Sequence, residues 1–233
     1  IVYRNADKVI AISKGVADDL IGNFDLAPGK VKIIYNPSAD PEIKTLAKEN
    51  VNHPWIEQNI PLIIGIGRLT KQKDFPTLIN AFSIVREEKL CRLMIIGEGD
   101  DRKNIENLIL KKSLGGDIKL MGYQSNPWKY LSKSNLLVMT SLWEGLGNVI
   151  IEAMYLGVPV ISTDCPSGPG ELLRDGELGG LVPIHNPELL ADRILDFLNN
   201  PHKYNEKVSK AAKESLKFSS SKIAEAYSIE LAN

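Results

Sequence analysis

Short apolar runs alternate with longer amphipathic segments through most of the chain. The runs have the length of strands buried on both faces, and the segments between them repeat apolar residues at helical spacing. The pattern predicts strands at 62–67, 92–97, 118–121, 135–141, 158–162 and 180–183, and helices at 75–89, 102–113, 127–133, 147–156, 170–174 and 187–199. Strands that alternate with helices form a doubly wound parallel sheet, so the predicted fold class is α/β and Rossmann-like.

A smaller strand–helix–strand unit precedes this sheet. The pattern predicts a strand at 8–12, a helix that Ser13 caps, and a strand at 31–35. Residues 38–60 are polar and contain prolines, so we expect a linker and a domain boundary near 36–60. Two helical segments are predicted in 201–232.

The composition is that of an ordinary globular protein, with 43% hydrophobic and 24% charged residues in 233. The net charge of -1 gives no electrostatic reason to bind nucleic acid, so we exclude that partner. Cys91 and Cys165 form neither a disulfide framework nor a zinc spacing, which favours a cytoplasmic location. The scattered histidines and the absence of an Asp-x-Asp triplet predict that no metal is bound.

The stretch 140–157 is predicted to hold a ligand, because it reads as a strand end, a turn and a helix closed by a glycine. Gly145 and Gly147 allow a tight turn that leaves the amides of Asn148 and Val149 unpaired at the start of the helix. Such a helix start binds anions. The stretch therefore predicts a phosphate site.

Two carboxylates flank this predicted phosphate site. Glu152 lies about 6 Å further along the helix than Asn148, given the rise per residue, where a ribose would sit next to the phosphate. Glu144 precedes the helix and can reach a group on the other side. The alternative for each residue alone is a solvated charge or a carboxylate that stabilises the helix start.

The segment 65–73 follows the first strand of the larger sheet and carries Arg68 and Lys73. Both cations extend from a strand end toward the edge that bears Glu144, so they could hold a diphosphate; surface basic residues are the alternative. A charge-assisted hydrogen bond contributes about 1.5–3 kcal/mol, more than the roughly 0.3–1 kcal/mol of a helix start. The segment lacks the third glycine of G-x-G-x-x-G, which argues against a dinucleotide-binding oxidoreductase.

Four segments resemble family 4 retaining glycosyltransferases of GT-B fold. E-G-L-G-N-V-I-I-E at 144–152 resembles the E-x7-E motif of that family, and G-R-L-T-K-Q-K at 67–73 resembles its G-R-L-x-x-x-K segment. The loop at 121–127 corresponds to the one whose backbone reads the donor base. Residues 162–171 resemble the S-T-D-C-P-S-G-P-x-E segment of a subgroup that builds surface and lipid-linked glycans, in which a basic residue often stands where Gly170 does here.

The resemblance implies a role for each matching residue. Glu144 would be the catalytic residue and hold the hydroxyls of the donor sugar, Arg68 and Lys73 would bind the diphosphate, and Glu152 the ribose. The donor-binding residues implied are Arg68, Lys73, Gly122, Tyr123, Gln124, Gly145, Leu146, Gly147, Asn148, Val149 and Glu152. The resemblance implies no cofactor, because the nucleotide-sugar is a substrate. We also expect the reaction to need no metal.

The resemblance also implies how the chain is organised. Residues 1–36 would be the remnant of an N-terminal Rossmann-like domain with its hinge, 37–200 the nucleotide-sugar-binding C-terminal domain of a GT-B enzyme, and 201–233 crossover helices. The rest of the N-terminal domain would be missing, so we expect this segment alone to be inactive. The whole protein would move a hexosyl or N-acetylhexosaminyl group, most simply from a UDP-sugar, to a glycan or lipid-linked acceptor with retention.

Two other functions stay open at this point. The chain could be a non-catalytic nucleotide-sugar-binding module that needs a partner chain, or, more distantly, a UDP-sugar epimerase of similar fold. A stripe of lysines at 207, 210, 213 and 217 could contact anionic lipid at the cytoplasmic face of a membrane, as a peripheral protein. A solvated helix face, which Glu206 and Glu214 interrupt, is the favoured interpretation of this stripe.

Overall fold

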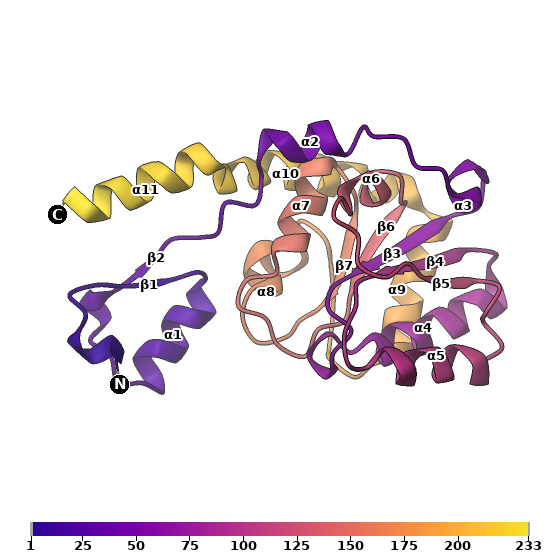
Figure 1. Cartoon of the computed structure of the whole chain (residues 1–233), viewed down its shortest axis with the longest axis horizontal. Helices are drawn as coiled ribbons and strands as arrows, with labels where there is room; N and C mark the ends of the chain where they lie inside the picture. Colours follow the sequence, from indigo (N-terminus) through magenta and orange to yellow (C-terminus); the bar gives the residue numbers. More distant parts are fainter. Residues whose placement is uncertain (1, 233) are drawn as a thin grey trace.

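Residues 2–232, which the computed structural model describes, form a six-stranded and a two-stranded parallel sheet (Figure 1). The strand order of the larger sheet is β5-β4-β3-β6-β7-β8. Its strands are β3 (Leu62–Ile66), β4 (Arg92–Ile96), β5 (Ile118–Leu120), β6 (Leu136–Met139), β7 (Val160–Thr163) and β8 (Gly180–Val182). The order runs outward in both directions from β3 and β6, as in Rossmann-like sheets. The predicted fold class is confirmed.

The central strands are buried on both faces, which explains why their sequences are apolar throughout. Ile63 and Ile64 of β3 are both fully buried, yet they belong to different clusters because successive side chains point to opposite faces. In the parallel register, Ile63 pairs with Leu93 of β4 and with Leu136 of β6. Two hydrophobic cores therefore lie on the two sides of one sheet.

Helices cover each face of the larger sheet (Figure 1). The helices on one face are α4 (Phe75–Glu88), α5 (Arg102–Lys111) and α9 (Pro187–Asn199). Those on the other face are α6 (Trp128–Leu131), α7 (Asn148–Leu156), α8 (Pro169–Leu172) and α10 (Asn205–Ser215). Along the described residues, no helix combines the length and the apolar character that crossing a bilayer would require.

The smaller sheet pairs β1 (Val9–Ala11) with β2 (Val31–Ile33) across α1 (Lys14–Gly22). Ser13 caps this helix as predicted, since its Oγ accepts a hydrogen bond from the Val16 amide at 3.1 Å. Short 3-10 turns complete the connections: η1 (Val2–Asn5), η2 (Pro28–Lys30), η3 (Lys71–Lys73), η4 (Arg174–Gly176), η5 (Pro201–Tyr204) and η6 (Leu216–Phe218).

The predicted polar linker at 38–60 is wrong in part, because it contains the helices α2 (Pro41–Leu46) and α3 (Pro54–Glu57). Asp40 caps α2 by accepting a hydrogen bond from the Glu42 amide at 3.0 Å, and Pro41 fixes the first helical residue. Ile43 is buried against the core of the larger sheet. Ala39 belongs to the same buried cluster, and Trp55 and Ile56 of α3 pack against it. A few apolar side chains therefore hold a segment whose sequence is otherwise polar.

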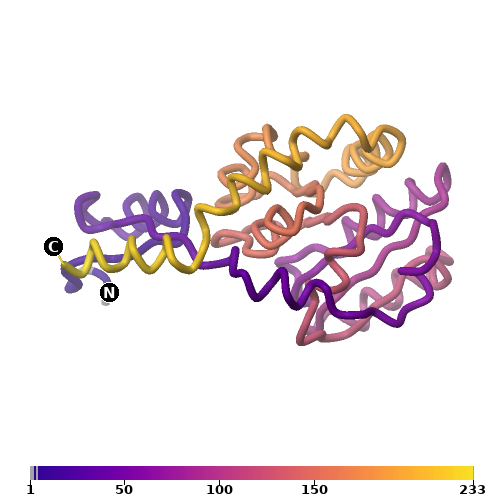
Figure 2. The backbone as a smooth tube through the Cα atoms, turned by 90° about the horizontal axis from the view of Figure 1, so that it is seen from above, coloured from indigo at the N-terminus to yellow at the C-terminus, as the bar shows by residue number. Residues whose placement is uncertain are grey.

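The chain passes twice between the two sheets, and the two passages are hydrogen-bonded to each other. The amides of Ser38 and Ala39 donate to the Phe218 carbonyl at 3.1 and 3.2 Å. The last helix, α11 (Ser220–Ala232), then runs beside the small unit (Figures 1 and 2), where Lys8 pairs with Glu230 at 3.1 Å. Ile1 and Asn233, the outer ends of the predicted first and last segments, lie outside the described residues.

The predicted lysine stripe is largely engaged with the protein itself. Lys207 Nζ donates to the Gly176 carbonyl at 2.7 Å, Lys210 pairs with Glu206 at 2.9 Å, and Lys217 pairs with Glu214 at 2.5 Å. Two of these lysines are therefore paired with glutamates three or four residues away along α10 and η6, as on an ordinary solvated helix face.

Candidate nucleotide-sugar site

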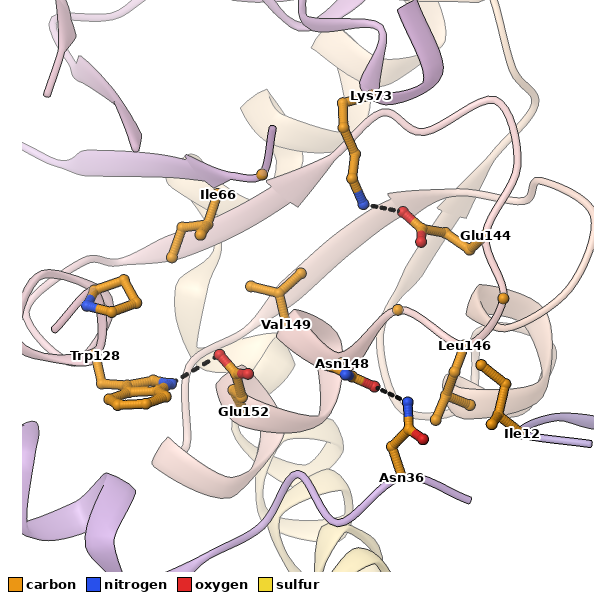
Figure 3. A pocket seen from close by; sticks show the side chains of 14 residues that line it. Ile12, Asn36, Ile66, Lys73, Trp128, Glu144, Leu146, Asn148, Val149 and Glu152 are labelled. Carbon is orange, nitrogen blue, oxygen red and sulfur yellow. Dashed lines mark hydrogen bonds and ion pairs between the residues drawn. The ribbon is translucent and has the colours of Figure 1, made fainter. Parts of the chain in front are cut away.

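A cavity of about 440 Å³ opens where the strand order reverses, between the carboxyl ends of β3 and β6 (Figure 3). This is the place where open α/β sheets bind ligands. The lining residues come from the small unit, the β3 end, the α6 turn and the β6–α7 loop. They are Ile12, Asn36, Ile66, Gly67, Lys73, Pro127, Trp128, Glu144, Gly145, Leu146, Gly147, Asn148, Val149 and Glu152.

Lys73 and Glu144 form an ion pair inside the cavity (Figure 3). Their side chains are only 16% and 8% exposed, so each charge depends on the other for compensation. The Ser141 hydroxyl also donates to Glu144 Oε1, at 2.6 Å. The structure thus joins two side chains that the sequence assigned to different parts of a ligand.

Hydrogen bonds hold the two loops that carry this pair. β6 ends at Met139, earlier than predicted, and the Thr140 hydroxyl then donates to the Lys73 carbonyl at 2.9 Å. On the same loop, the Leu142 amide donates to the Gln72 carbonyl at 2.8 Å. The Lys73 and Glu144 side chains are therefore carried on backbones that cannot separate without breaking these bonds.

The start of helix α7 lines the cavity through Gly147, Asn148 and Val149. Gly147 precedes the helix with φ 92°, a left-handed conformation that favours glycine, whereas Gly145 does not need one. The Asn36 side chain donates to Asn148 Oδ1 at 3.2 Å, which brings the connection after β2 to the start of the helix. Because the first amides of a helix lack intrahelical acceptors, this end can bind an anion.

Glu152 lies one turn further along α7, at the other end of the cavity from Glu144 (Figure 3). Its Oε2 accepts a hydrogen bond from Trp128 Nε1 at 2.8 Å. Burial raises the pKa of the Glu152 carboxyl, and the hydrogen bond from Trp128 opposes that shift. The carboxylate pair therefore brackets the helix start, as the spacing predicted.

A second cavity of about 260 Å³ adjoins the first and shares Ile66, Gly67 and Pro127 with it. Arg68, Tyr123 and Gln124 line this second cavity rather than the one that contains Lys73. Its wall is formed by two strand-end loops, which the hydrogen bond from the Gly97 amide to the Gly122 carbonyl joins at 2.9 Å. The predicted residue Gly122 thus supports the wall through its backbone.

The small unit contacts the ligand side of the larger sheet directly. The Ser13 hydroxyl donates to the Gly145 carbonyl at 2.6 Å, and Ile12 reaches the cavity wall beside it. Glu171 of α8 accepts hydrogen bonds from the Lys14 amide at 2.9 Å and from the Tyr35 hydroxyl at 2.5 Å. Burial, and then this bond to Glu171, raise the pKa of Tyr35. One carboxylate therefore contacts both the start of α1 and the connection after β2.

Residues 48–215 match the protein family described as glycosyl transferases group 1. The chain belongs to this family. The match contains each predicted donor-binding residue and helix α3, but it begins after α2. The family assignment therefore rests on the larger sheet and its site.

Among curated relatives, an uncharacterized glycosyltransferase of Methanocaldococcus jannaschii is 37% identical over 174 residues, which are 73% of this chain and 43% of that protein. An N-acetylgalactosamine-N,N'-diacetylbacillosaminyl-diphospho-undecaprenol 4-alpha-N-acetylgalactosaminyltransferase of Campylobacter jejuni is 31% identical over 220 residues, which are 93% of this chain and 56% of that protein. The glycosyltransferase chain thus spans about half the length of these relatives.

Solved structures of glycosyltransferases share the fold. TarM of Staphylococcus aureus, in a variant complex with fondaparinux, alpha-GlcNAc-glycerol and UDP, superposes with a TM-score of 0.81 at 29% identity. That match covers 97% of this chain and 44% of TarM. Anabaena HepE in complex with UDP and glucose superposes with a TM-score of 0.86 at 23% identity, over 99% of this chain and 64% of HepE, and shows the fold alone.

Sequence reasoning missed several lining residues of this glycosyltransferase site. Trp128 was placed only within the predicted helix at 127–133, and Asn36 was treated only as a boundary after a predicted strand, yet both line the cavity. Ile12 was assigned only to its own strand. A signal existed for Trp128, because a partly buried indole N–H needs a hydrogen-bond acceptor. The sequence did not show that this acceptor is Glu152, since the contact depends on how α6 packs against α7.

Proposed function

We propose that this chain is the donor-binding part of a retaining glycosyltransferase. The whole protein would move a hexosyl or N-acetylhexosaminyl group from a nucleotide-diphosphate donor, a UDP-sugar being the favoured class, to a hydroxyl of a glycan or lipid-linked acceptor. Lys73 and the start of α7 would together bind the diphosphate, and Arg68 would also bind it from the adjoining cavity. Glu152 would bind the ribose. Glu144 would hold the hydroxyls of the sugar.

One observation carries this proposal: the cavity at the strand reversal joins a lysine, a free helix start and a carboxylate at each end. A diphosphate needs cations and amides, and the hydroxyls of ribose and sugar need acceptors. The order Glu144, helix start, Glu152 matches the order sugar, diphosphate, ribose. The adjoining cavity at Tyr123 and Gln124 extends from the ribose end, where the base would lie against the backbone.

Relatives support the donor and acceptor classes. The TarM complex contains UDP, and the Campylobacter jejuni relative is named for transfer to a diphospho-undecaprenol-linked sugar. Transfer requires the acceptor oxygen within about 3–3.5 Å of the anomeric carbon. We propose that an N-terminal domain outside this chain supplies most acceptor contacts, since the small unit contributes Ile12 to the cavity lining and the connection after β2 contributes Asn36.

Binding of UDP-glucose or UDP-N-acetylglucosamine, compared with UDP by calorimetry, tests the proposal. Replacing Glu144 by glutamine is expected to weaken binding of the preferred UDP-sugar roughly tenfold, since a hydrogen bond to a charged acceptor is lost. UDP itself should bind as tightly as before or more tightly, because Lys73 loses the competing carboxylate of its ion pair.

The exposed residue Glu225 on α11 offers a matched control, and its change to glutamine should alter neither affinity. Equal losses for UDP and UDP-sugar in the Glu144→Gln variant would contradict the assigned role. Failure of the unmodified chain to bind any nucleotide-sugar would refute the proposed function itself.

We further propose that donor binding needs no divalent metal. Lys73, Arg68 and the α7 start already offset the charge of a diphosphate, and no group of three or more His, Cys, Asp or Glu suited to a metal occurs within residues 2–232. Chelation with EDTA should leave the calorimetric affinity for UDP within about twofold, a difference of less than 0.5 kcal/mol. A loss of binding that manganese or magnesium restores would overturn this prediction.

A further inference from the structure

Trp128 occupies the ribose end of the cavity and has no role assigned so far. It begins α6 directly after Pro127, and both residues line the cavity. The turn before it is anchored, because the buried Asn126 donates from Nδ2 to the Leu46 carbonyl at 2.9 Å. The half-buried indole is therefore held in a fixed place on the cavity wall, and its ring also packs against the hydrophobic core.

The indole N–H points at one oxygen of Glu152 (Figure 3). Within the described part of the chain, Trp128 is the hydrogen-bond partner found for this side chain, through Oε2 at 2.8 Å. An ionised carboxylate has two oxygens and about four acceptor positions, so Oε1 keeps its capacity for a ligand. Because a charged acceptor is held by a neutral donor, its ionised form gains support without a competing cation.

We propose that Trp128 is a positioning residue, which orients the Glu152 carboxylate so that its remaining oxygen accepts hydrogen bonds from the hydroxyls of a nucleotide ribose. The inference rests on the proposed function. In this arrangement the indole sets which oxygen faces the cavity and prevents the glutamate side chain from rotating away. A ligand with a ribose hydroxyl then finds an acceptor already in place, whereas a deoxyribose leaves a buried carboxylate oxygen without a partner.

The Trp128→Phe variant tests the inference, because phenylalanine keeps an aromatic ring and removes only the N–H donor with part of the indole. We expect the Kd for UDP to rise roughly tenfold, the effect of one hydrogen bond to a charged group. We also expect the unmodified chain to prefer UDP over 2′-deoxy-UDP, and the variant to lose most of that preference. A general loss of packing would weaken both nucleotides equally and leave their ratio unchanged.

Two further variants sharpen this test. Trp55 is likewise half-buried but lies outside the cavity, so Trp55→Phe should change neither affinity nor the ratio. In a Glu152→Gln background the Trp128→Phe change should have a much smaller effect on UDP binding, since the two residues act as one unit.

The outcomes separate the inference from the function on which it rests. If the unmodified chain binds UDP and discriminates against 2′-deoxy-UDP while Trp128→Phe behaves identically, the positioning role is wrong and the proposed function stands. If the unmodified chain binds neither nucleotide, the proposed function fails and the inference fails with it. Additive effects of the Trp128 and Glu152 changes would also overturn the positioning role.

Discussion

Replacing Lys73 by methionine is expected to lower the free energy of unfolding by about 3 kcal/mol, the lower end of the cost of breaking a buried ion pair from one side. Glu144 would remain in the cavity with its side chain only 8% exposed and with the Ser141 hydroxyl as its remaining donor. Methionine matches the length of the lysine stem, so the loss would come from the charge rather than from packing. Chemical denaturation measures this loss.

The same change removes the cation that we assign to the donor diphosphate. Loss of one charge-assisted hydrogen bond corresponds to about 1.5–3 kcal/mol, so the Kd for UDP should rise roughly 10- to 100-fold. The double variant Lys73→Met/Glu144→Gln separates the two effects. It should recover much of the stability, because no charge is left unpaired, yet it should bind UDP as poorly as the single variant.

Lys71 is the matched control, since it lies on the same turn, η3, and is exposed. Lys71→Met should keep both stability and UDP affinity, to within about 0.5 kcal/mol, as is usual for surface changes. If Lys73→Met were as stable as Lys71→Met, the ion pair would contribute nothing to the fold. Recovery of UDP binding in the double variant would show that Glu144, and not Lys73, governs the diphosphate site.

The larger sheet could be predicted from the sequence because its signal is local and repeated. Strands such as β3 are apolar at each position since both faces are covered, and the helices between them keep one apolar side. The position of the site followed from the same pattern, because the motif residues sit after β3 and β6, the strands between which the order reverses.

The pairing of side chains could not be predicted in the same way. Lys73 and Glu144 are 71 residues apart, and their ion pair depends on how the loops after β3 and β6 meet across the edge of the sheet. The contact between Trp128 and Glu152 depends likewise on the packing of α6 against α7. Sequence spacing places a residue on an element, but it does not give the distance between side chains on different elements.

Short helices also could not be predicted from the hydrophobic pattern. Helix α2 has a single buried residue, Ile43, so no periodicity of apolar positions reveals this helix. The cap at Asp40 and the proline after it were the available signal, and they were interpreted as a linker because prolines are common in both. The actual helix begins at Pro41, where such a cap predicts a start.

Gly97, in the loop after β4, packs against the loop after β3, and alanine at this position is the second change with a large expected effect. Gly97 has φ 145°, a conformation that other residues rarely adopt. A Cβ at this position would lie 1.9 Å from the Gly67 carbonyl oxygen. That carbonyl cannot easily move away, because the Gly67 amide donates to the Ile96 carbonyl at 3.0 Å and the Leu69 amide donates to the Glu98 carbonyl at 2.9 Å.

Gly97→Ala is therefore expected to lower the free energy of unfolding by about 3–5 kcal/mol, combining backbone strain with overpacking. The loop that would be displaced includes Arg68, which lines the adjoining cavity. UDP binding should therefore also weaken at temperatures where the variant is still folded. Gly116 provides the control, since a Cβ there meets no atom within 4 Å and alanine should change stability by less than about 1 kcal/mol. Thermal and chemical denaturation measure both variants, and a Gly97→Ala chain as stable as Gly116→Ala would show that the two strand-end loops do not approach as closely as this structure places them.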